Sequence, residues 1–475
     1  MGLLSPISAV TTTGIYCRHG CPGRPKRRNV VGFGSTVAAE AAGFRPCLRC
    51  RPDRLPPLSR LADAPAVVER ALVLISEGAL DEARDEELAL RLSISGRQLR
   101  RLFLQHVGAT PAFVARSRRA HFARRLLDET DMSMTRVAFA AGFSSVRQLN
   151  RVMLDTFRLS PSALRTKRFR NDRLVADGGL PLRLPYDGPL AFDQMLAFLR
   201  PRAIPGVEAV GPDVYRRTIS TCGSPGVIEL RDAGDGCHLL LLAHLPTFDA
   251  LIDDVTRSRR IFALDQKPDV WLPVLMRDPL LAPLVAARPG LRPPGAWDRF
   301  EIAVRVIIGQ GISVAAASTL TGRLATAFGA AVAGLDAFEL ARVFPSAQQL
   351  ADAPLPKLTA LGLTETRAVA IRSLAVAYAC GQLSLEPTSS LDELDGQLCE
   401  VPGIGPWTAQ FIALRAAGHL DALPAEDLGL RRALARLRGS PGETASAQEL
   451  RDAAERWRPY RAVGAIHLWM SLASE

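Results

Sequence analysis

The chain has 475 residues, 48% of them hydrophobic, and it carries a formal net charge of +11. This length predicts about three or four domains, and the excess of positive charge favours a polyanionic partner such as DNA. No run of about 18 apolar residues occurs, and residues 1–10 lack the features of a signal peptide, so we exclude a membrane-spanning helix and expect a cytoplasmic protein without a membrane partner.

The first predicted domain, residues 1–54, is basic, rich in turn residues and marked by clustered cysteines. The pattern is Cys-x3-Cys, a gap of 25 residues and then Cys-x2-Cys, which in a cytoplasmic chain suits a tetrahedral zinc site better than disulfides. We therefore predict a small α+β domain with one Zn²⁺, held by Cys17, Cys21, Cys47 and Cys50. The other four cysteines are scattered, and we expect them to be buried small hydrophobic residues.

The basic residues around this cluster suggest a second role for it, beside the simpler alternative of a purely structural site. Zinc-bound thiolates stay nucleophilic at neutral pH, so one held against DNA could attack an alkyl group. The segments TTTGIYCRHGCPGRPKRRNV and AAGFRPCLRCRPD strongly resemble the zinc domain of Ada-type methylation-response proteins. The resemblance implies that Cys17 accepts a methyl group from a methylated DNA phosphotriester. The site then loses one negative charge, and its affinity for DNA should rise.

The same resemblance implies that either the start codon is misplaced or this first domain is shortened at its N-terminus. Family members carry an additional strand-bearing segment before the TTGIYC motif, where this chain has only residues 1–11.

The second predicted domain, residues 62–168, follows the proline-containing linker 54–65 and reads as helices throughout. Residues 86–108 and 134–165 each predict a helix, a turn and a second helix. One such unit would fit a helical bundle with solvated arginines, but two in tandem resemble the AraC-type double helix-turn-helix. That resemblance implies promoter DNA and RNA polymerase as partners. We expect DNA contacts from Arg97, Gln98, Arg101, Ser145, Arg147 and Gln148.

A second polar linker, residues 170–179, precedes the C-terminal half of the chain. Residues 180–290 show strand and turn patterns, most clearly over 227–245, and predict an α+β antiparallel-sheet domain. Residues 291–475 are helical, broken by short Gly/Pro turns, and predict an all-α helix-hairpin-helix domain. The sequence therefore predicts four domains.

The stretch CEVPGIGPWTAQF, residues 399–411, carries the clearest site signal in the last domain. Gly403 and Gly405 leave backbone N–H groups uncovered, and the following helix adds its dipole, so the turn can bind a phosphate. An ordinary turn between helices explains such a motif about as well. Asp427 lies 22 residues beyond Gly405, where it is expected to cap a helix.

Together with residues 182–208 and 300–324, these segments resemble AlkA-type 3-methyladenine DNA glycosylases, and the resemblance covers residues 180–475. It implies that an alkylated base is flipped out of the duplex and that Asp427 is the catalytic carboxylate, which stabilises the oxocarbenium-like sugar or orients water. The implied aromatic pocket for a cationic base consists of Trp407, Phe411 and Trp469, although core packing would also explain these residues. The implied DNA contacts of this domain are Gly403, Gly405, Thr408, Gln310 and Ile312.

Three sequence features that the chain lacks limit the reactions and cofactors that we expect. Lyase-type relatives place a lysine where this chain has Trp407, so no Schiff base can form and we predict a monofunctional hydrolase. The chain has no C-terminal four-cysteine signature, so we expect no iron–sulfur cluster, and no PCHR segment, so we expect no O6-alkylguanine repair. The family places a bulkier wedge at Gly311; here either Ile312 substitutes or the wedge is weak.

The sequence therefore predicts a nucleoid-associated fusion of a zinc-cysteine sensor, a transcription activator and an alkylbase DNA glycosylase. Its partners would be double-stranded DNA, alkylated DNA and promoter DNA. Two alternatives stay open. One is a DNA-binding regulator without glycosylase activity, and the other is a glycosylase with a non-functional, truncated sensor.

Overall fold

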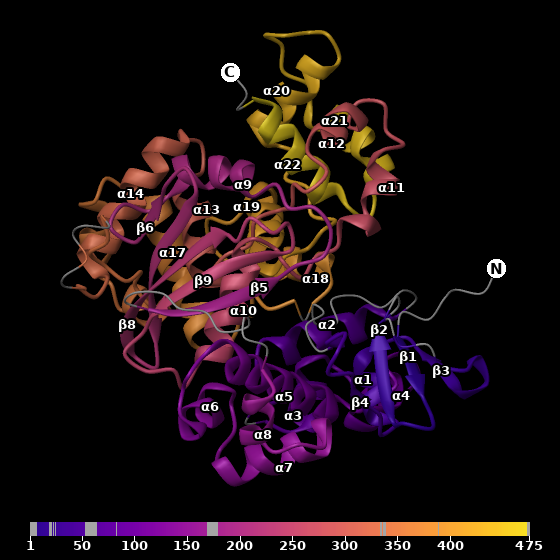
Figure 1. The fold of residues 1–475 in the computed structure, drawn as a ribbon. Coiled ribbons are helices and arrows are strands. Elements are labelled where there is room, and N and C mark those ends of the chain that lie inside the picture. Colours follow the sequence, from indigo (N-terminus) through magenta and orange to yellow (C-terminus); the bar gives the residue numbers. More distant parts are fainter. Residues whose placement is uncertain are drawn as a thin grey trace. The chain divides into compact units, whose positions relative to one another are not determined.

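The computed structural model describes residues 7–472, apart from 19–20, 22, 24, 53–63, 82, 169–178, 333–334, 336–338 and 388. The predicted boundaries at residues 54 and 62, and most of the second predicted linker, lie outside the described residues. The chain divides into two compact units, Met1–Pro185 with Leu245–Thr256, and Tyr186–His244 with Arg257–Glu475 (Figure 1).

The first unit begins with a four-stranded sheet in the order β3-β1-β2-β4. Strand β1 pairs antiparallel with β2 and β3, whereas β2 and β4 pair parallel. One helix, α1 (Thr36–Ala41), lies between β3 and β4 in the sequence and is capped by Ser35. The strands are β1 (Ile7–Val10), β2 (Ile15–Arg18), β3 (Val30–Phe33) and β4 (Arg45–Pro46). The predicted small α+β domain is confirmed, and its first strand precedes the TTGIYC motif.

Residues 66–166 of the first unit are helical, as predicted, and contain two helix-turn-helix pairs, α3–α4 and α6–α7. Ser95 and Ser145 cap the second helix of each pair, because their hydroxyl oxygens accept the backbone N–H groups of Gln98 and Gln148 at 3.1 Å. The helices are α2 (Ala66–Ser76), α3 (Asp85–Arg91), α4 (Gly96–His106), α5 (Pro111–Glu129), α6 (Met134–Ala140), α7 (Val146–Phe157) and α8 (Pro161–Thr166).

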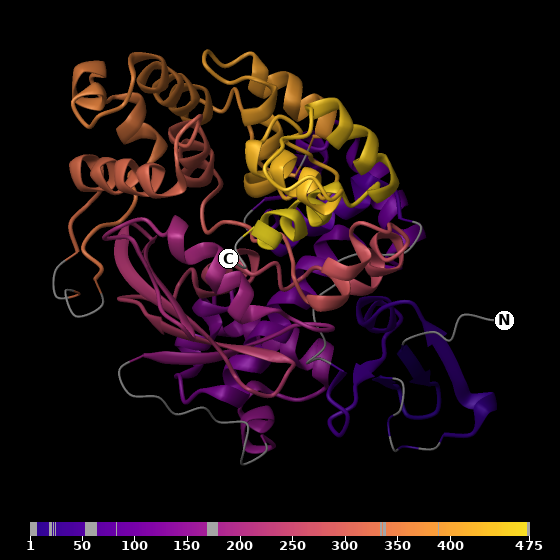
Figure 2. The same cartoon turned by 90° about the horizontal axis from the view of Figure 1, so that it is seen from above.

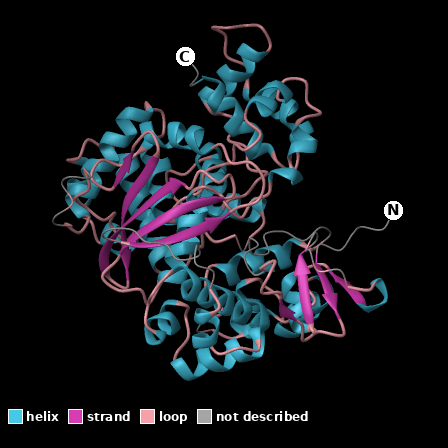
Figure 3. Cartoon of the chain, in the orientation of Figure 1, coloured by secondary structure: helices cyan, strands magenta, loops and turns pink. Residues whose placement is uncertain are grey.

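The predicted antiparallel sheet is present, with strand order β5-β9-β8-β7-β6 (Figure 3). Its central hairpin, β7–β8, is in register from Val214↔Arg231 to the turn at Thr221↔Ser224. The strands are β5 (Leu180–Pro185), β6 (Glu208–Val210), β7 (Val214–Thr221), β8 (Ser224–Asp232) and β9 (His238–His244), and helix α9 (Phe192–Leu199) follows β5.

The remainder of the second unit is helical. Figure 2 shows its later helices in orange and yellow. One hydrophobic core includes residues of α13, α17, α18 and α19, and a second surrounds the fully buried Trp271 and Trp457 beside α20 and α22. Helix α10 (Leu251–Ile261) spans the boundary at Thr256 and Arg257. The later helices are α11 (Leu272–Leu275), α12 (Ala282–Ala287), α13 (Arg299–Ile308), α14 (Val314–Phe328), α15 (Ala347–Ala351), α16 (Leu355–Thr359), α17 (Glu365–Ala379), α18 (Leu391–Cys399), α19 (Pro406–Ile412), α20 (Leu428–Leu437), α21 (Ala447–Ala454) and α22 (Arg461–Leu472).

Buried ion pairs join the sheet of the second unit to helix α13. Arg217 of β7 contacts Glu301 of α13 at 2.6 Å, and Arg305 of α13 contacts Glu208 of β6 at 3.1 Å. Buried ion pairs of this kind add less net stability than their charges suggest, but removal of one partner strands the other charge in the interior. The pairs therefore fix the position of α13, whose C-terminus leads into the candidate site.

Candidate functional site

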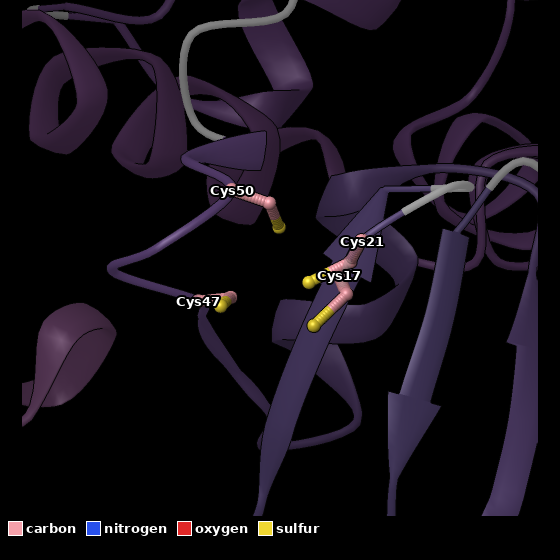
Figure 4. Close-up of side chains that lie close together, drawn as sticks. All are labelled: Cys17, Cys21, Cys47 and Cys50. Carbon is pink, nitrogen blue, oxygen red and sulfur yellow. The ribbon is translucent and has the colours of Figure 1, made fainter. Parts of the chain in front are cut away.

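The four clustered cysteines converge, as Figure 4 shows, and their sulfur atoms all lie within 4.8 Å of one another. The parallel pairing of β2 with β4 explains the convergence, because Tyr16 pairs with Pro46 and the residue after each is a cysteine of the cluster. Zinc–sulfur bonds of about 2.3 Å would place the sulfurs of a tetrahedral site about 3.8 Å apart. The described geometry therefore fits a zinc ion.

The titration of these thiols also favours a cation. Burial and the charges of Cys47 and Cys50 raise the pKa of Cys17 well above its usual range, and burial also raises the pKa of Cys50 to about 11. Burial acts in the same direction on Cys47, but N–H groups of the Cys50 and Arg49 backbone outweigh it and lower its pKa. The raised pKa values of Cys17 and Cys50 favour protonated thiols at these two positions, which is typical of sites where metal binding displaces protons.

Buried polar contacts attach this cysteine-bearing sheet to helix α5. Glu40 of α1 accepts a hydrogen bond from Tyr16, the neighbour of Cys17, and from Ser117 of α5, each at 2.6 Å. His121 of α5 contacts the same carboxylate at 2.6 Å. Burial raises the pKa of the Glu40 carboxyl group, but these three partners outweigh burial, so the pKa is lowered. Sequence reasoning did not find this contact, because its partners lie 77 and 81 residues apart.

The scattered cysteines do not behave as predicted. The expectation that they are buried is wrong, because all four are exposed: Cys222, Cys237, Cys380 and Cys399. Cys222 lies in the tight β7–β8 turn. Cys237 lies in the loop before β9, where its sulfur is 3.1 Å from His238 Nδ1. Composition alone gave no sign of these positions.

The two capped helices α4 and α7 present different sets of side chains. Arg97, Gln98 and Arg101 of α4 are exposed, as is Arg147 of α7. Ser145 and Gln148 instead make local contacts, because Ser145 caps α7 and the Gln148 side-chain oxygen accepts the backbone N–H of Ser144 at 2.9 Å. The exposed arginines are the residues best placed to meet a nucleic acid.

The turn between α18 and α19 combines one crowded glycine with one open glycine. Gly403 has φ +84°, and a Cβ there would lie 2.7 Å from the Cβ of Ala370 in α17. Gly405 is the N-cap of α19, and a Cβ there would meet nothing within 4 Å. An anion can therefore approach the N-terminus of α19 at Gly405 without steric hindrance.

Two other predicted DNA contacts of this domain, Gln310 and Thr408, are bonded to each other. Thr408 is buried, and its hydroxyl accepts a hydrogen bond from the Gln310 side chain at 2.8 Å. Gln310 also donates to the Gly403 carbonyl at 3.0 Å. Ile312 is half-buried, and the neighbouring Gly311 is exposed with φ +62°.

Asp427 is the N-cap of α20, and one of its oxygens is held from two sides. Asp427 Oδ1 accepts the Leu430 backbone N–H and the Trp469 indole N–H, both at 2.9 Å. Gly429 makes this approach possible, since a Cβ there would lie 3.3 Å from the indole ring of Trp469. Within the described part of the chain, Oδ2 has no hydrogen-bond partner, so this oxygen can act on a bound molecule.

Half-buried aromatic rings line the region beside Asp427. The centroids of Trp407 and Phe411 lie 5.5 Å apart, and those of Phe411 and Trp469 lie 5.2 Å apart. The structure adds Phe198 of α9, 6.4 Å from Trp469, with the Arg202 guanidinium 3.9 Å from its ring centroid. Burial lowers the pKa of Arg202 to about 10, although Asp427 opposes that shift.

No helix within the described residues is long and apolar enough to cross a membrane. Family models match four successive parts of the chain: the metal binding domain of Ada over residues 7–53, a helix-turn-helix domain over 88–167, the AlkA N-terminal domain over 181–298 and the HhH-GPD superfamily of base excision DNA repair proteins over 304–459.

Two curated relatives and one solved structure extend this match. The chain is 40% identical over 474 residues to the probable bifunctional transcriptional activator/DNA repair enzyme AlkA of Mycobacterium tuberculosis, covering 98% of the chain and 92% of that relative. It is 35% identical over 288 residues to DNA-3-methyladenine glycosylase 2 of Escherichia coli, which covers 60% of this chain and 95% of that relative. The 3-methyladenine DNA glycosylase structure from Archaeoglobus fulgidus matches at 24% identity with a TM-score of 0.52, covering 60% of this chain and 96% of that one, and shows the fold alone.

Proposed function

Because the chain belongs to the family of bifunctional transcriptional activator/DNA repair enzymes of the AlkA type, we propose that it is a monofunctional DNA glycosylase joined to an alkylation-responsive activator. Its substrate is duplex DNA that contains alkylated bases of the 3-methyladenine and 7-methylguanine type. The observation that carries the enzyme assignment is the Asp427 carboxylate, fixed through one oxygen beside a group of aromatic rings. We divide the chain into functional domains at residues 1–54, 62–168, 180–290 and 291–475.

The proposed reaction begins with capture of the DNA backbone and rotation of the damaged nucleotide out of the stack. A backbone phosphate binds at the N-terminus of α19 beside Gly405. The flipped base carries a positive charge, which the faces of Trp407, Phe411 and Trp469 attract. Because the base is already cationic, it can leave without prior protonation by the enzyme.

Asp427 acts on the sugar that is left behind. The bond between C1′ and the base nitrogen breaks, and its electron pair goes to the base, which departs neutral. The free oxygen of Asp427 stabilises the developing positive charge on the sugar or orients the attacking water. Water adds its oxygen to C1′ and releases one proton. Trp407 occupies the position where a lyase needs its amine, so hydrolysis ends the reaction.

The test is release of free base from DNA that contains 3-methyladenine. Asp427→Asn should abolish release, and it should stay folded because asparagine caps helices as well as aspartate does. Asp298→Asn is the matched control, since Asp298 caps α13 through a 2.8 Å bond to the Glu301 backbone. Equal release by wild type and Asp427→Asn would refute the assignment.

The cysteine cluster supports a second proposal, in which the first domain holds one zinc ion and accepts a methyl group. The Cys17 thiolate attacks the methyl carbon of a phosphotriester. A carbon–sulfur bond forms, the carbon–oxygen bond breaks, and its electron pair returns to the phosphate, which regains its charge. When bound, zinc supplies stabilised thiolates.

The methyl acceptor can be identified by mass spectrometry after incubation with methylated DNA. One added methyl group on Cys17 is expected, whereas the exposed Cys222, which lies outside the groups of potential metal ligands found among the described residues, should stay unmodified. Stoichiometric zinc without methyl transfer would leave only a structural role. Equal modification of both cysteines would indicate non-specific alkylation.

The exposed arginines of α4 and α7 support promoter binding by the helical part of the first unit, with RNA polymerase as the recruited partner. Arg101→Ala and Arg147→Ala should each weaken promoter binding in a footprinting assay. Promoter binding by a protein that releases no base would favour the alternative of a regulator without glycosylase activity.

A further inference from the structure

The loop between α13 and α14 is joined directly to the turn that precedes α19. Gln310, the second residue after α13, uses its side-chain nitrogen to donate to the Gly403 carbonyl at 3.0 Å and to the Thr408 hydroxyl at 2.8 Å. These partners lie 93 and 98 residues further along the chain. A third contact comes from Arg367 of α17, whose guanidinium donates to the Gln310 carbonyl.

These contacts occupy the side-chain donors with which Gln310 would otherwise read DNA. An amide nitrogen has two hydrogens, and here they are donated to Gly403 and Thr408. The backbone carbonyl of Gln310 is also engaged. A base or phosphate could reach this nitrogen only if the contacts to Gly403 and Thr408 were broken first.

The residues that receive these contacts are themselves held in place. Thr408 is buried in α19. Gly403 packs so closely against α17 that a Cβ would lie 2.7 Å from Ala370. The far side of the loop is different, because a Cβ at Gly311 would meet nothing within 4 Å. Gln310 therefore connects an exposed loop to a rigid support.

We infer that Gln310 is a positioning residue for base flipping, which sets the distance between the α13–α14 loop and the phosphate-binding turn. The inference rests on the proposed glycosylase function. The turn holds the backbone of the damaged strand, and the loop, with Ile312, enters the space that the flipped base vacates. Flipping is efficient only if both elements meet the duplex at a fixed spacing.

The direct test replaces Gln310 with methionine, which has similar length and no charge but cannot donate to Gly403 or Thr408. Single-turnover release of 3-methyladenine should fall by about 10- to 100-fold, since small misplacements in an active site reduce rates on this scale. The affinity for undamaged duplex should change by less than about twofold, because the phosphate-binding turn is intact. Gln348→Met on the exposed surface of α15 is the matched control and should leave both values unchanged.

A second variant reaches the same contact from the other side. Thr408→Val keeps the shape of the side chain and removes the hydroxyl acceptor, so it should also slow release. The double variant Gln310→Met/Thr408→Val should be no slower than Gln310→Met alone, because the two changes break one contact. Additive losses would overturn the inference. Thermal unfolding of each variant shows whether the fold is retained.

Flipping itself is measured by the fluorescence of 2-aminopurine placed beside the lesion. The signal should fall in Gln310→Met and stay at the wild-type level in Gln348→Met. An unchanged signal, or a loss of release matched by the same loss of affinity for undamaged DNA, would overturn the inference and mark Gln310 as dispensable or as a direct DNA contact. This signal does not depend on bond cleavage. A wild-type protein that flips but releases no base would therefore count against the proposed function alone.

Discussion

Replacement of Trp469 by phenylalanine separates two contributions to the proposed active site. The change keeps an aromatic ring beside Phe411 but removes the indole N–H that donates to Asp427 Oδ1 at 2.9 Å. A hydrogen bond to a charged group contributes about 1.5–3 kcal/mol, and each 1.36 kcal/mol corresponds to about a tenfold change in rate. We therefore expect single-turnover release of 3-methyladenine to fall by about 10- to 100-fold in Trp469→Phe.

The physical reason is orientation of the carboxylate. The Leu430 backbone N–H still holds Oδ1 in the variant, but the carboxylate can then rotate about that single contact. Loss of orientation should slow the release of cationic and neutral lesions by the same factor, because it acts on the sugar and not on the base. Phe411→Leu is the comparison, since it leaves both hydrogen bonds of Asp427 in place and removes one ring that attracts the cation.

The assay is quench-flow measurement of free base from two duplexes, one with 7-methylguanine and one with a neutral lesion such as hypoxanthine. Phe411→Leu should slow the cationic substrate more than the neutral one. A wild-type rate in Trp469→Phe would refute the argument that the indole N–H orients Asp427. Selective loss of the cationic substrate in both variants would show that Trp469 acts only as a pocket wall.

Three further predictions concern the stability of the second unit, and each is checked by urea unfolding. Glu301→Gln should lower the free energy of unfolding by at most about 3–5 kcal/mol, because it removes the 2.6 Å ionic partner of the buried Arg217 and leaves Glu208, 3.6 Å away, to compensate that charge, whereas Glu449→Gln on the surface should change it far less; an equally small effect at Glu301 would mean that Glu208 alone compensates Arg217. Burial, with help from the charge of Arg288, lowers the pKa of His467 to about 4, so the unfolded chain binds the extra proton, and stability should fall by roughly 3 kcal/mol as the pH drops from about 6.5 to about 4. His467→Gln should remove that part of the acid sensitivity, and an unchanged pH profile would contradict the assignment. Gly403→Ala should destabilise the fold by more than the roughly 1–2 kcal/mol expected for positive φ alone, and Gly439→Ala, where φ is +87° and a Cβ meets nothing within 4 Å, measures that backbone cost; equal losses would show that Ala370 moves aside.

The sequence predicted best those sites whose residues are recognised by their spacing along the chain. The two cysteine pairs predicted a metal centre, and the register of β2 and β4 explains why they meet. The predicted helix cap at Asp427 is present, because an aspartate before an amphipathic segment has a local partner in the Leu430 N–H. The fold class followed from the change between strand patterns and helical patterns.

Contacts between distant segments could not be predicted in the same way. Gln310 and Thr408 stay predicted DNA contacts, but the bond between them could not be foreseen, because no local pattern indicates a contact across 98 residues. Phe198 of α9 and Arg202, three residues after the end of α9, join the aromatic group although they precede Asp427 by more than two hundred residues. Phenylalanine and arginine are common in helices, so only the folded structure shows that these two residues lie near the site.

The paired arrangement of the cysteines has a consequence for the entropy of the unfolded chain. Strand β4 has only two residues, too few to hold its place in a sheet by hydrogen bonds alone. A metal bound by both pairs acts as a cross-link that closes a loop of 25 residues. By analogy with a disulfide, this closure removes roughly 3–4 kcal/mol of conformational freedom from the unfolded state. Each end of the loop is attached twice, so conversion of the Cys17 thiolate to a thioether leaves Cys21 to hold its end. The cross-link can then survive the proposed methyl transfer.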